Sequence, residues 1–161
     1  MDFTIEQHLE STPAKIAALY LDADFLASVG DPHLAHPELL DQQRNGSVVT
    51  QRIRYYFTAE LSSAVRRVID PDRLTWVEES THDLHSHTTT ARIEPDHYAD
   101  RLEARYEVAM SKDGKGTRRV TTGMLTVHMH FVGGRVEDVI VSGLRDHAEL
   151  ETAAVAHWLA R

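Results

Sequence analysis

The sequence predicts an α+β fold in which a seven-stranded antiparallel sheet wraps around one long C-terminal helix. Three observations predict it. Strand-like alternation recurs in seven segments, two short helical segments follow the first strand, and residues 135–161 repeat apolar residues at helical spacing. The chain has 161 residues, of which 42% are hydrophobic and 26% are charged, and these values are typical of one globular domain. We therefore treat residues 1–161 as a single domain.

The N-terminal part of the chain predicts one strand and two short helices. Asp2–Glu10 alternates apolar and polar residues, as a half-buried strand does. Thr12 and Pro13 mark a helix start, because a threonine hydroxyl can cap the first turn and proline suits the first helical position. A second helix begins near Asp22 and ends at Gly30. So short a connection predicts a bent pair of helices rather than one rod.

From Glu38 onward the pattern is that of strands joined by hairpins. Asn45-Gly46 is a strong hairpin signal, because a type I′ turn needs two residues with positive φ. Residues 58–69 are expected to form a short helical turn or an irregular edge. The six strands predicted in this part of the chain are 39–44, 47–57, 74–81, 85–94, 101–110 and 117–132.

The last segment, residues 135–161, predicts a single long helix. Its apolar residues recur at three- and four-residue steps, which gathers them along one stripe. Gly133-Gly134 is expected to separate this helix from the preceding strand. Glu137 lies in the expected first turn, where the helix dipole favours negative charge. Gly143 lies on the stripe although glycine there costs about 0.5–1 kcal/mol relative to alanine. Either the sheet packs closely against Gly143 or a ligand passes over it, and we favour close packing.

The order of elements and several short motifs resemble a known superfamily. The motifs are Phe131–Glu137 (FVGGRVE), Leu74–Glu78 (LTWVE) and the N-terminal alternation. The whole chain resembles the helix-grip fold of the Bet v 1, START and polyketide-cyclase (SRPBCC) superfamily, and within it an actinobacterial family of unassigned function. The resemblance implies a hydrophobic cavity between the sheet and the C-terminal helix, which the superfamily uses for lipids, sterols, polyketides and plant hormones. Because one fold hosts many functions, the residues that line the cavity must decide among them.

The composition excludes several classes of function. A net charge of -8 repels phosphate backbones, so nucleic acid is not an expected partner. The absence of cysteine excludes disulfides and thiolate chemistry. The chain has no apolar run of about 18 residues and no basic N-terminal region followed by an apolar one. We therefore expect a cytoplasmic protein without stable membrane insertion.

The expected function is the binding of a small apolar or amphipathic ligand, lipid-like or polyketide-like, by a carrier or sensor. The sequence contains neither a Gly-x-Ser-x-Gly nucleophile motif nor a phosphate-binding loop, and it predicts no cofactor. It does not specify an oligomeric state. The residues predicted to line the cavity are Tyr55, Phe57, Trp76, Tyr106, Val108, Leu125 and Val127 on strands, and Ile140 and Leu144 on the helix.

Two alternatives remain open at this point. The first is an enzyme, a cyclase or dehydratase in which Glu78 or His87 transfers protons, because a buried carboxyl group has a raised pKa and can act as an acid or base. The second is a protein-interaction or chaperone-like module whose own side chains fill the cavity. We expect a binding protein more than an enzyme.

Two histidine pairs invite a metal hypothesis. His85 with His87, and His128 with His130, each place two imidazoles on one face of a predicted strand, which is a chelating arrangement. Neither pair has an obvious third ligand, and the predicted topology puts them at opposite ends of the sheet. No metal site is therefore predicted. His85 and His87 are expected to point into the cavity or to form a polar rim, while His128 and His130 point outward.

Overall fold

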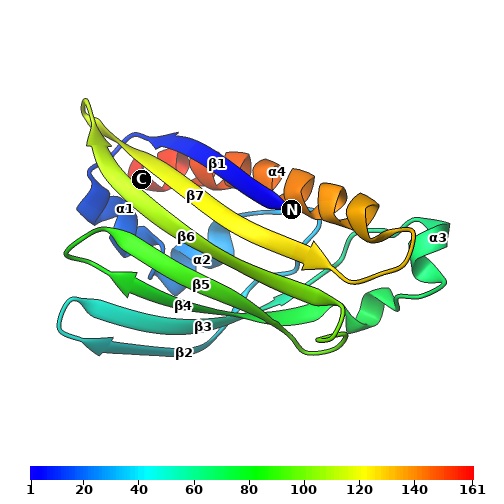
Figure 1. The fold of residues 1–161 in the computed structure, drawn as a ribbon. Coiled ribbons are helices and arrows are strands. Elements are labelled where there is room, and N and C mark those ends of the chain that lie inside the picture. The colour runs from blue at the N-terminus through cyan, green and yellow to red at the C-terminus, as the bar shows by residue number, and fades with distance from the viewer.

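The structure, a computed structural model, describes all residues from Met1 to Arg161 and shows an antiparallel sheet curved around a long helix (Figure 1). This confirms the predicted fold class. The elements in chain order are β1 (Asp2–Leu9), α1 (Pro13–Leu19), α2 (Ala23–Ser28), β2 (Glu38–Asn45), β3 (Val48–Tyr56), α3 (Ser63–Arg66), the short 3-10 helix η1 (Pro71–Arg73), β4 (Thr75–Asp83), β5 (Thr88–Pro95), β6 (Leu102–Asp113), β7 (Gly116–Val127) and α4 (Gly133–Leu159).

The seven strands form one sheet in the order β1-β7-β6-β5-β4-β3-β2, with every neighbouring pair antiparallel. The first strand therefore lies beside the last, while the other strands follow one another along the chain. The predicted turn at Asn45-Gly46 joins β2 to β3, and Gly46 adopts a positive φ of 62° there. Such a backbone conformation is readily available to glycine.

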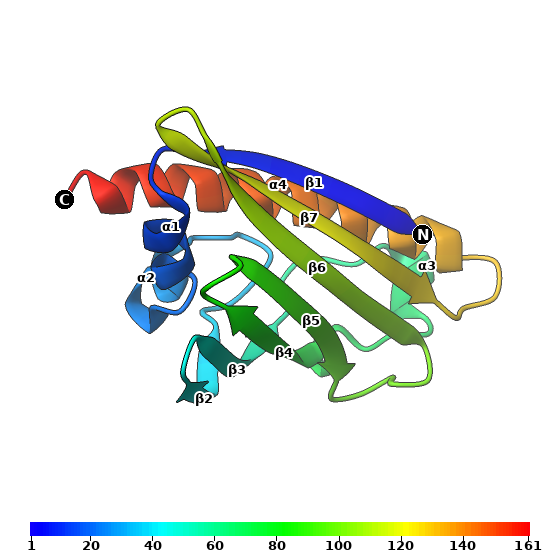
Figure 2. The same cartoon turned by 60° about the vertical axis from the view of Figure 1, so that its left-hand side comes forward.

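The cap that the sequence predicts at Thr12 is present, and Asp22 caps the second helix, which ends at Ser28 instead of Gly30. The Thr12 hydroxyl accepts a hydrogen bond from the Lys15 N–H, and the Asp22 carboxylate accepts from the N–H groups of Asp24 and Phe25. These bonds satisfy donors that the first turn of a helix leaves free. α1 and α2 close one end of the curved sheet (Figure 2).

Helix α4 lies along β1 and β7, with which it makes its main contacts. Val141, Ala148 and Val155 are buried at seven-residue intervals and form the face that meets these strands. Strands β2 to β5 curve away from the helix, as the two views show (Figures 1 and 2). The helix therefore covers one side of the inner face of the sheet more fully than the other.

The hydrophobic core is divided into two clusters, and neither contains a residue of β3, β4 or β5. The first fills the closed end, where Ile16 and Phe25 meet Val155 of α4. The second lies between β1, β7 and α4 and includes Phe3 and Leu125. Val49, Ile53 and Ala91 on the inner faces of β3 and β5 are buried as well, but they belong to neither cluster.

Two predicted boundaries in the C-terminal part were wrong. α4 begins at Gly133, so Gly133-Gly134 forms its first turn instead of a break before it. A Cβ atom on Gly133 would lie only 2.6 Å from the Val127 carbonyl oxygen, which explains glycine at that position. Glu137 follows the first turn, and its carboxylate accepts a hydrogen bond from the Val127 N–H at 2.9 Å. β7 ends at Val127, so Phe131 lies in a loop, fully exposed and with a φ of 66°.

None of the four α-helices combines the length and the apolar character that crossing a bilayer requires.

Candidate functional site

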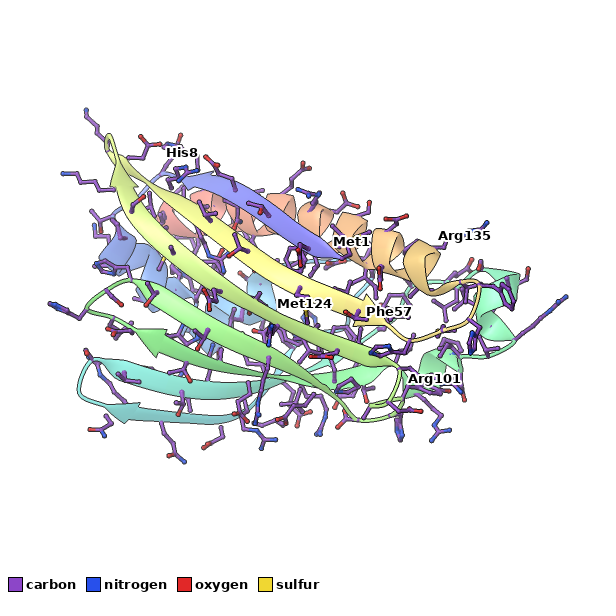
Figure 3. All side chains as sticks on the ribbon, viewed as in Figure 1. Met1, His8, Phe57, Arg101, Met124 and Arg135 are labelled. Carbon is purple, nitrogen blue, oxygen red and sulfur yellow. The ribbon has the colours of Figure 1, made fainter.

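The candidate site is the region between the inner face of β3 to β6 and the neighbouring side of α4, and we call it the hollow. Figure 3 draws the side chains on the ribbon from the same side as Figure 1. The chain exposes 9520 Å² of accessible surface. A folded monomer of this size typically exposes about 8,100 Å². The excess agrees with a concave sheet face that α4 leaves partly uncovered.

One wall of the hollow is aromatic. Tyr55 of β3 and Trp76 of β4 are paired across the two strands, and their rings stack with centroids 5.8 Å apart and planes inclined by 16°. Both side chains stay half-buried although they lie on the inner face. They form a flat aromatic surface that belongs to neither core cluster.

A carboxyl group and a phenol lie next to this wall. Glu78 is the next inward residue of β4, between Ile53 and Ile93 on the neighbouring strands. Burial raises the pKa of Glu78, and a hydrogen bond from the Tyr106 hydroxyl opposes that rise. Glu78 is half-buried as a residue and belongs to neither core cluster. Burial also raises the pKa of Tyr106 well above its usual value, which keeps this phenol protonated at neutral pH.

A second polar group occupies the closed end of the hollow, and we call it the Arg119 cluster. It consists of Arg119, Gln7, Tyr20, His147 and Glu151. The Arg119 guanidinium stacks over the Tyr20 ring at 4.2 Å, and Nη1 of Arg119 donates to Gln7 Oε1 at 2.6 Å. The same Nη1 lies 3.8 Å from Glu151 Oε2, which also accepts a hydrogen bond from the Tyr20 hydroxyl at 3.0 Å.

His147 extends the Arg119 cluster to the loop before β2. Its Nε2 lies 3.4 Å from Glu151 Oε1 and its Nδ1 lies 2.7 Å from Asp31 Oδ2. Burial lowers the pKa of His147, but the two carboxylates outweigh that effect and raise it to about 9. Burial alone would likewise raise the pKa of Glu151, yet His147 and Arg119 hold it below its usual value. Opposite charges therefore alternate from Asp31 to Arg119.

The loop before β2 covers the hollow from the side. The Ala35 N–H donates to the Tyr56 carbonyl at 3.0 Å, and the Thr58 N–H donates to the His33 carbonyl at 2.9 Å. Between this loop and α4 only a crevice of about 20 Å³ remains, which is about the space of one water molecule. Its lining includes Tyr55, His147 and Glu151. The loop thus seals the gap between β3 and α4.

Sequence reasoning missed the Arg119 cluster, although the pattern contains a signal for it. Arg119 shares the inward phase of β7 with Leu125 and Val127, so its charge interrupts a buried face. Glu151 interrupts the stripe of α4 in the same way. Charged residues are rarely buried without a partner. One inward charge on each of two facing elements therefore predicts an internal ion pair.

His82 was also missed. It shares the inward face of β4, where the Ser80 hydroxyl lies 2.9 Å from its Nε2 and the Thr89 hydroxyl lies 3.1 Å from its Nδ1. Burial, together with the charge of Arg119, lowers the pKa of His82 to about 4. The imidazole is therefore neutral at neutral pH and serves as a hydrogen-bonding part of the wall.

The structure places the predicted cavity residues in two groups. Tyr55, Trp76, Tyr106 and Ile140 are half-buried, as is the enzyme candidate Glu78, and Tyr106 and Ile140 pack against the second core cluster. Val108, Leu125 and Val127 are buried, and Leu125 packs in the second core cluster. Phe57 follows β3 and pairs with Leu34, and Leu144 is 38% exposed on α4.

The predicted strand around His85 and His87 begins later than expected. β5 starts at Thr88, so both histidines lie in the turn between β4 and β5. His85 is exposed, whereas His87 has a φ of 56° and a buried Nδ1 without a hydrogen-bond partner. His128 is exposed in the loop that follows β7. No three His, Asp or Glu side chains lie close enough together to hold a metal ion.

The expectation of close packing at Gly143 was wrong. A Cβ atom built on Gly143 meets no atom within 4 Å. The contrast with Gly123 of β7 is clear, because a Cβ atom there would collide with the Phe3 ring and lie 2.8 Å from the Arg105 carbonyl oxygen. The helix wall beside the hollow is therefore open at Gly143.

A separate cleft of about 550 Å³ lies where β5 and β6 stop pairing, beyond Ile93 and Ala104. Its lining carries many charged groups, and an apolar ligand there would remove those groups from water without replacing their hydration. We therefore do not assign the site to this cleft. Its charged lining residues are Arg92, Glu94, Asp100, Glu103 and Arg105.

The curved antiparallel sheet and the long C-terminal helix along it define a protein of the helix-grip fold. Within this class, the chain belongs to the family described as "Protein of unknown function (DUF2505)", which matches residues 4–159. No curated protein matches the chain significantly.

Solved structures of similar fold cover nearly the whole chain. A protein from Thermus thermophilus, TTHA0849, has a TM-score of 0.69 and 16% identity, with 96% of this chain and 94% of that chain covered. The ZhuI aromatase/cyclase from Streptomyces sp. R1128 has a TM-score of 0.65 and 12% identity over 96% and 90% of the two chains. Ara h 8.0201 has a TM-score of 0.63 and 12% identity over 98% of each chain. At these identities the likeness establishes the fold alone.

Proposed function

We propose that this protein binds a small apolar or amphipathic molecule in the hollow between β3 to β6 and α4, as a carrier or sensor. One observation carries the proposal. Tyr55, Trp76, Glu78 and Tyr106 remain half-buried on the inner face of the sheet, opposite a helix whose Gly143 meets no atom within 4 Å. Concave, mostly apolar surfaces with a few polar groups are typical of small-molecule sites.

The fold gives this proposal a second line of support. A similar structure carries the name of an aromatase/cyclase. The inner-face residues that stay half-buried are our reason to prefer binding to the alternative of an interaction module whose own side chains fill the cavity. Leu144 and Phe57, which the sequence places in the site, lie at its edges in our proposal. The actinobacterial relationship and the cytoplasmic location stay predictions of the sequence.

Proton transfer by Glu78 is a second candidate function, and one specific observation favours it. Burial raises the pKa of this carboxyl group, and Tyr106 hydrogen-bonds to it inside the hollow. A carboxyl group with a raised pKa can deliver a proton to a bound ligand. His87 lies in the turn between β4 and β5, while Glu78 lies inside β4. We therefore prefer Glu78 for this role.

Native mass spectrometry of the freshly purified protein tests the binding function. We expect an adduct of small-molecule mass that is lost after extraction with organic solvent. Gly143→Leu should remove the adduct, because its side chain enters the hollow. Gly134→Leu is the matched control, since Gly134 lies in the same helix, also has no atom within 4 Å of a Cβ and is exposed.

The outcomes separate the candidates. A wild-type protein that carries no adduct, and that takes up no apolar fluorescent probe, contradicts the binding function. An adduct whose mass changes during incubation of the wild type, but not of Glu78→Gln, favours the enzyme. An unchanged adduct in both proteins favours the carrier or sensor.

A further inference from the structure

Two nitrogen atoms of the Arg119 guanidinium donate to no protein group. The hydrogen bonds of this group leave from Nη1, which donates to Gln7 Oε1 at 2.6 Å and to Thr121 Oγ1 at 3.4 Å. Nε and Nη2 have no acceptor in the protein. His87 Nδ1 is the one side-chain polar atom that is both buried from water and without a partner, so Nε and Nη2 must both be accessible to water. Arg119 lies on the inner face of β7, so these two donors are available to a molecule inside the hollow.

The charge of Arg119 is nevertheless already balanced. Glu151 lies 3.8 Å from Nη1, and His147 lies between Glu151 and Asp31. Together with Asp31, these residues therefore supply two cations, Arg119 and His147, and two anions. A ligand that reaches Nε and Nη2 finds hydrogen-bond donors but no unmatched positive charge. A carboxylate placed there would lose its hydration without gaining a free counter-charge.

Glu78, on the wall next to the Arg119 cluster, also disfavours an anionic ligand. Glu78 feels the field of both Glu151 and Arg119, so it lies within electrostatic reach of the cluster. A second carboxylate brought close to Glu78 would be repelled, or would force one of the two to bind a proton. The polar groups of the hollow thus suit an acceptor without charge.

Resting on the proposed function, we propose that the bound molecule is uncharged and carries a carbonyl oxygen that accepts hydrogen bonds from Nε and Nη2 of Arg119, while its apolar body lies along Tyr55 and Trp76. Arg119 is then the residue that orients the ligand. Fatty acids and other anionic amphiphiles are poorer ligands than neutral ketones, esters or quinone-like molecules of similar size.

Three fluorescent probes test the proposal. Prodan is neutral and carries a ketone, N-phenylnaphthylamine is neutral without a carbonyl group, and anilinonaphthalene sulfonate adds a negative charge to the latter skeleton. For the wild type we expect both neutral probes to bind at least about tenfold more tightly than the sulfonate, because the sulfonate loses hydration that no free counter-charge replaces. Bound prodan should emit at long wavelength, because its ketone accepts hydrogen bonds from Arg119.

Arg119→Met should weaken prodan binding about tenfold or more and shift its emission to shorter wavelength. Binding of N-phenylnaphthylamine should stay within about twofold in the same variant, because a probe without a carbonyl group forms no such bond. Arg105→Met is the matched control. Arg105 is exposed on the outer face of β6 and forms no ion pair, so neither probe should respond.

Arg119→Lys keeps the experiment decisive if the methionine variant does not fold. Lysine preserves the charge beside Glu151 but lacks the planar fork of donors, so prodan should still bind more weakly and emit at shorter wavelength. The proposal is overturned if the sulfonate binds as tightly as its neutral counterpart, or if prodan and N-phenylnaphthylamine respond equally to both substitutions. If none of the three probes binds the wild type, the proposed function itself fails, and that result is distinct from both of these.

Discussion

Nδ1 of His147 in α4 lies 2.7 Å from Oδ2 of Asp31, and this contact ties the middle of the long helix to the loop before β2. The exposed fractions of the two side chains are 24% and 7%, so the pair is largely removed from water. The same imidazole reaches Glu151 on its other side. The side wall of the hollow is thus held by a histidine between two carboxylates.

The first prediction concerns pH. The pKa of His147 is raised to about 9. In the unfolded chain it is about 6.5. Stabilisation by the charged imidazole is therefore complete below about pH 6.5, and it is lost as the pH rises through about 9. Urea unfolding should show a loss of up to about 3 kcal/mol across this window in the wild type.

The control for this pH dependence is His147→Gln, which cannot take up a proton. Its unfolding free energy should change much less between about pH 6 and pH 9.5 than that of the wild type. Glu151 and Arg119 keep their charges throughout this window, because the pKa of Glu151 is lowered and arginine does not lose its proton. Equal slopes for the two proteins would show that another group causes the pH dependence.

The second prediction compares two phenols that donate to carboxylates. The Tyr20 hydroxyl donates to Glu151 inside the protein at 3.0 Å, and the Tyr56 hydroxyl donates to Glu38 at the surface at 2.8 Å. Tyr20→Phe should cost about 1.5–3 kcal/mol, since it leaves a buried carboxylate with one donor fewer. Tyr56→Phe should cost less than about 1 kcal/mol, because water replaces the lost donor. Chemical denaturation of both variants measures the difference, and similar losses would mean that Glu151 is hydrated.

The third prediction uses two glycines with opposite surroundings. Gly143→Ala should stabilise the protein by about 0.5–1 kcal/mol, because alanine is the better helix former and its methyl group meets no atom within 4 Å. Gly123→Ala should instead destabilise it by about 1–3 kcal/mol, since the methyl group collides with the Phe3 ring. Thermal melts of the two variants should therefore move in opposite directions. A lower melting temperature for Gly143→Ala would contradict the open helix wall.

Much of the fold follows from local sequence signals. Strand alternation, the turn at Asn45-Gly46 and the caps at Thr12 and Asp22 each act within a few residues, and they placed the elements correctly. The end of β7 could not be predicted in this way. Phe131 continues the apolar alternation of the strand, but the backbone leaves the sheet after Val127 to begin α4. Only the packing of the helix decides where the strand stops.

The site was less predictable because it depends on contacts between distant segments. That Tyr55, Trp76, Glu78 and Tyr106 share one face of the sheet follows from their phase on individual strands. The Arg119 cluster joins β1, α1, β7 and α4, and no pattern within one segment specifies these neighbours. Gly143 shows the same limit, since its place on the stripe of α4 does not reveal the distance to the sheet.

The most direct test of the central claim is energy transfer from Trp76 to bound N-phenylnaphthylamine. Trp76 lies on the wall of the hollow, whereas Trp158 packs beside Phe25 at the closed end. Trp158→Phe and Trp76→Phe therefore provide two proteins with one tryptophan each.

We predict saturable, one-to-one quenching of Trp76 in the Trp158→Phe variant. The quenching should be weaker for Trp158 in the reciprocal variant, and it should be lost when Gly143→Leu is added to Trp158→Phe. Quenching that does not saturate, or that is stronger for Trp158 than for Trp76, would contradict a ligand site between β3 to β6 and α4.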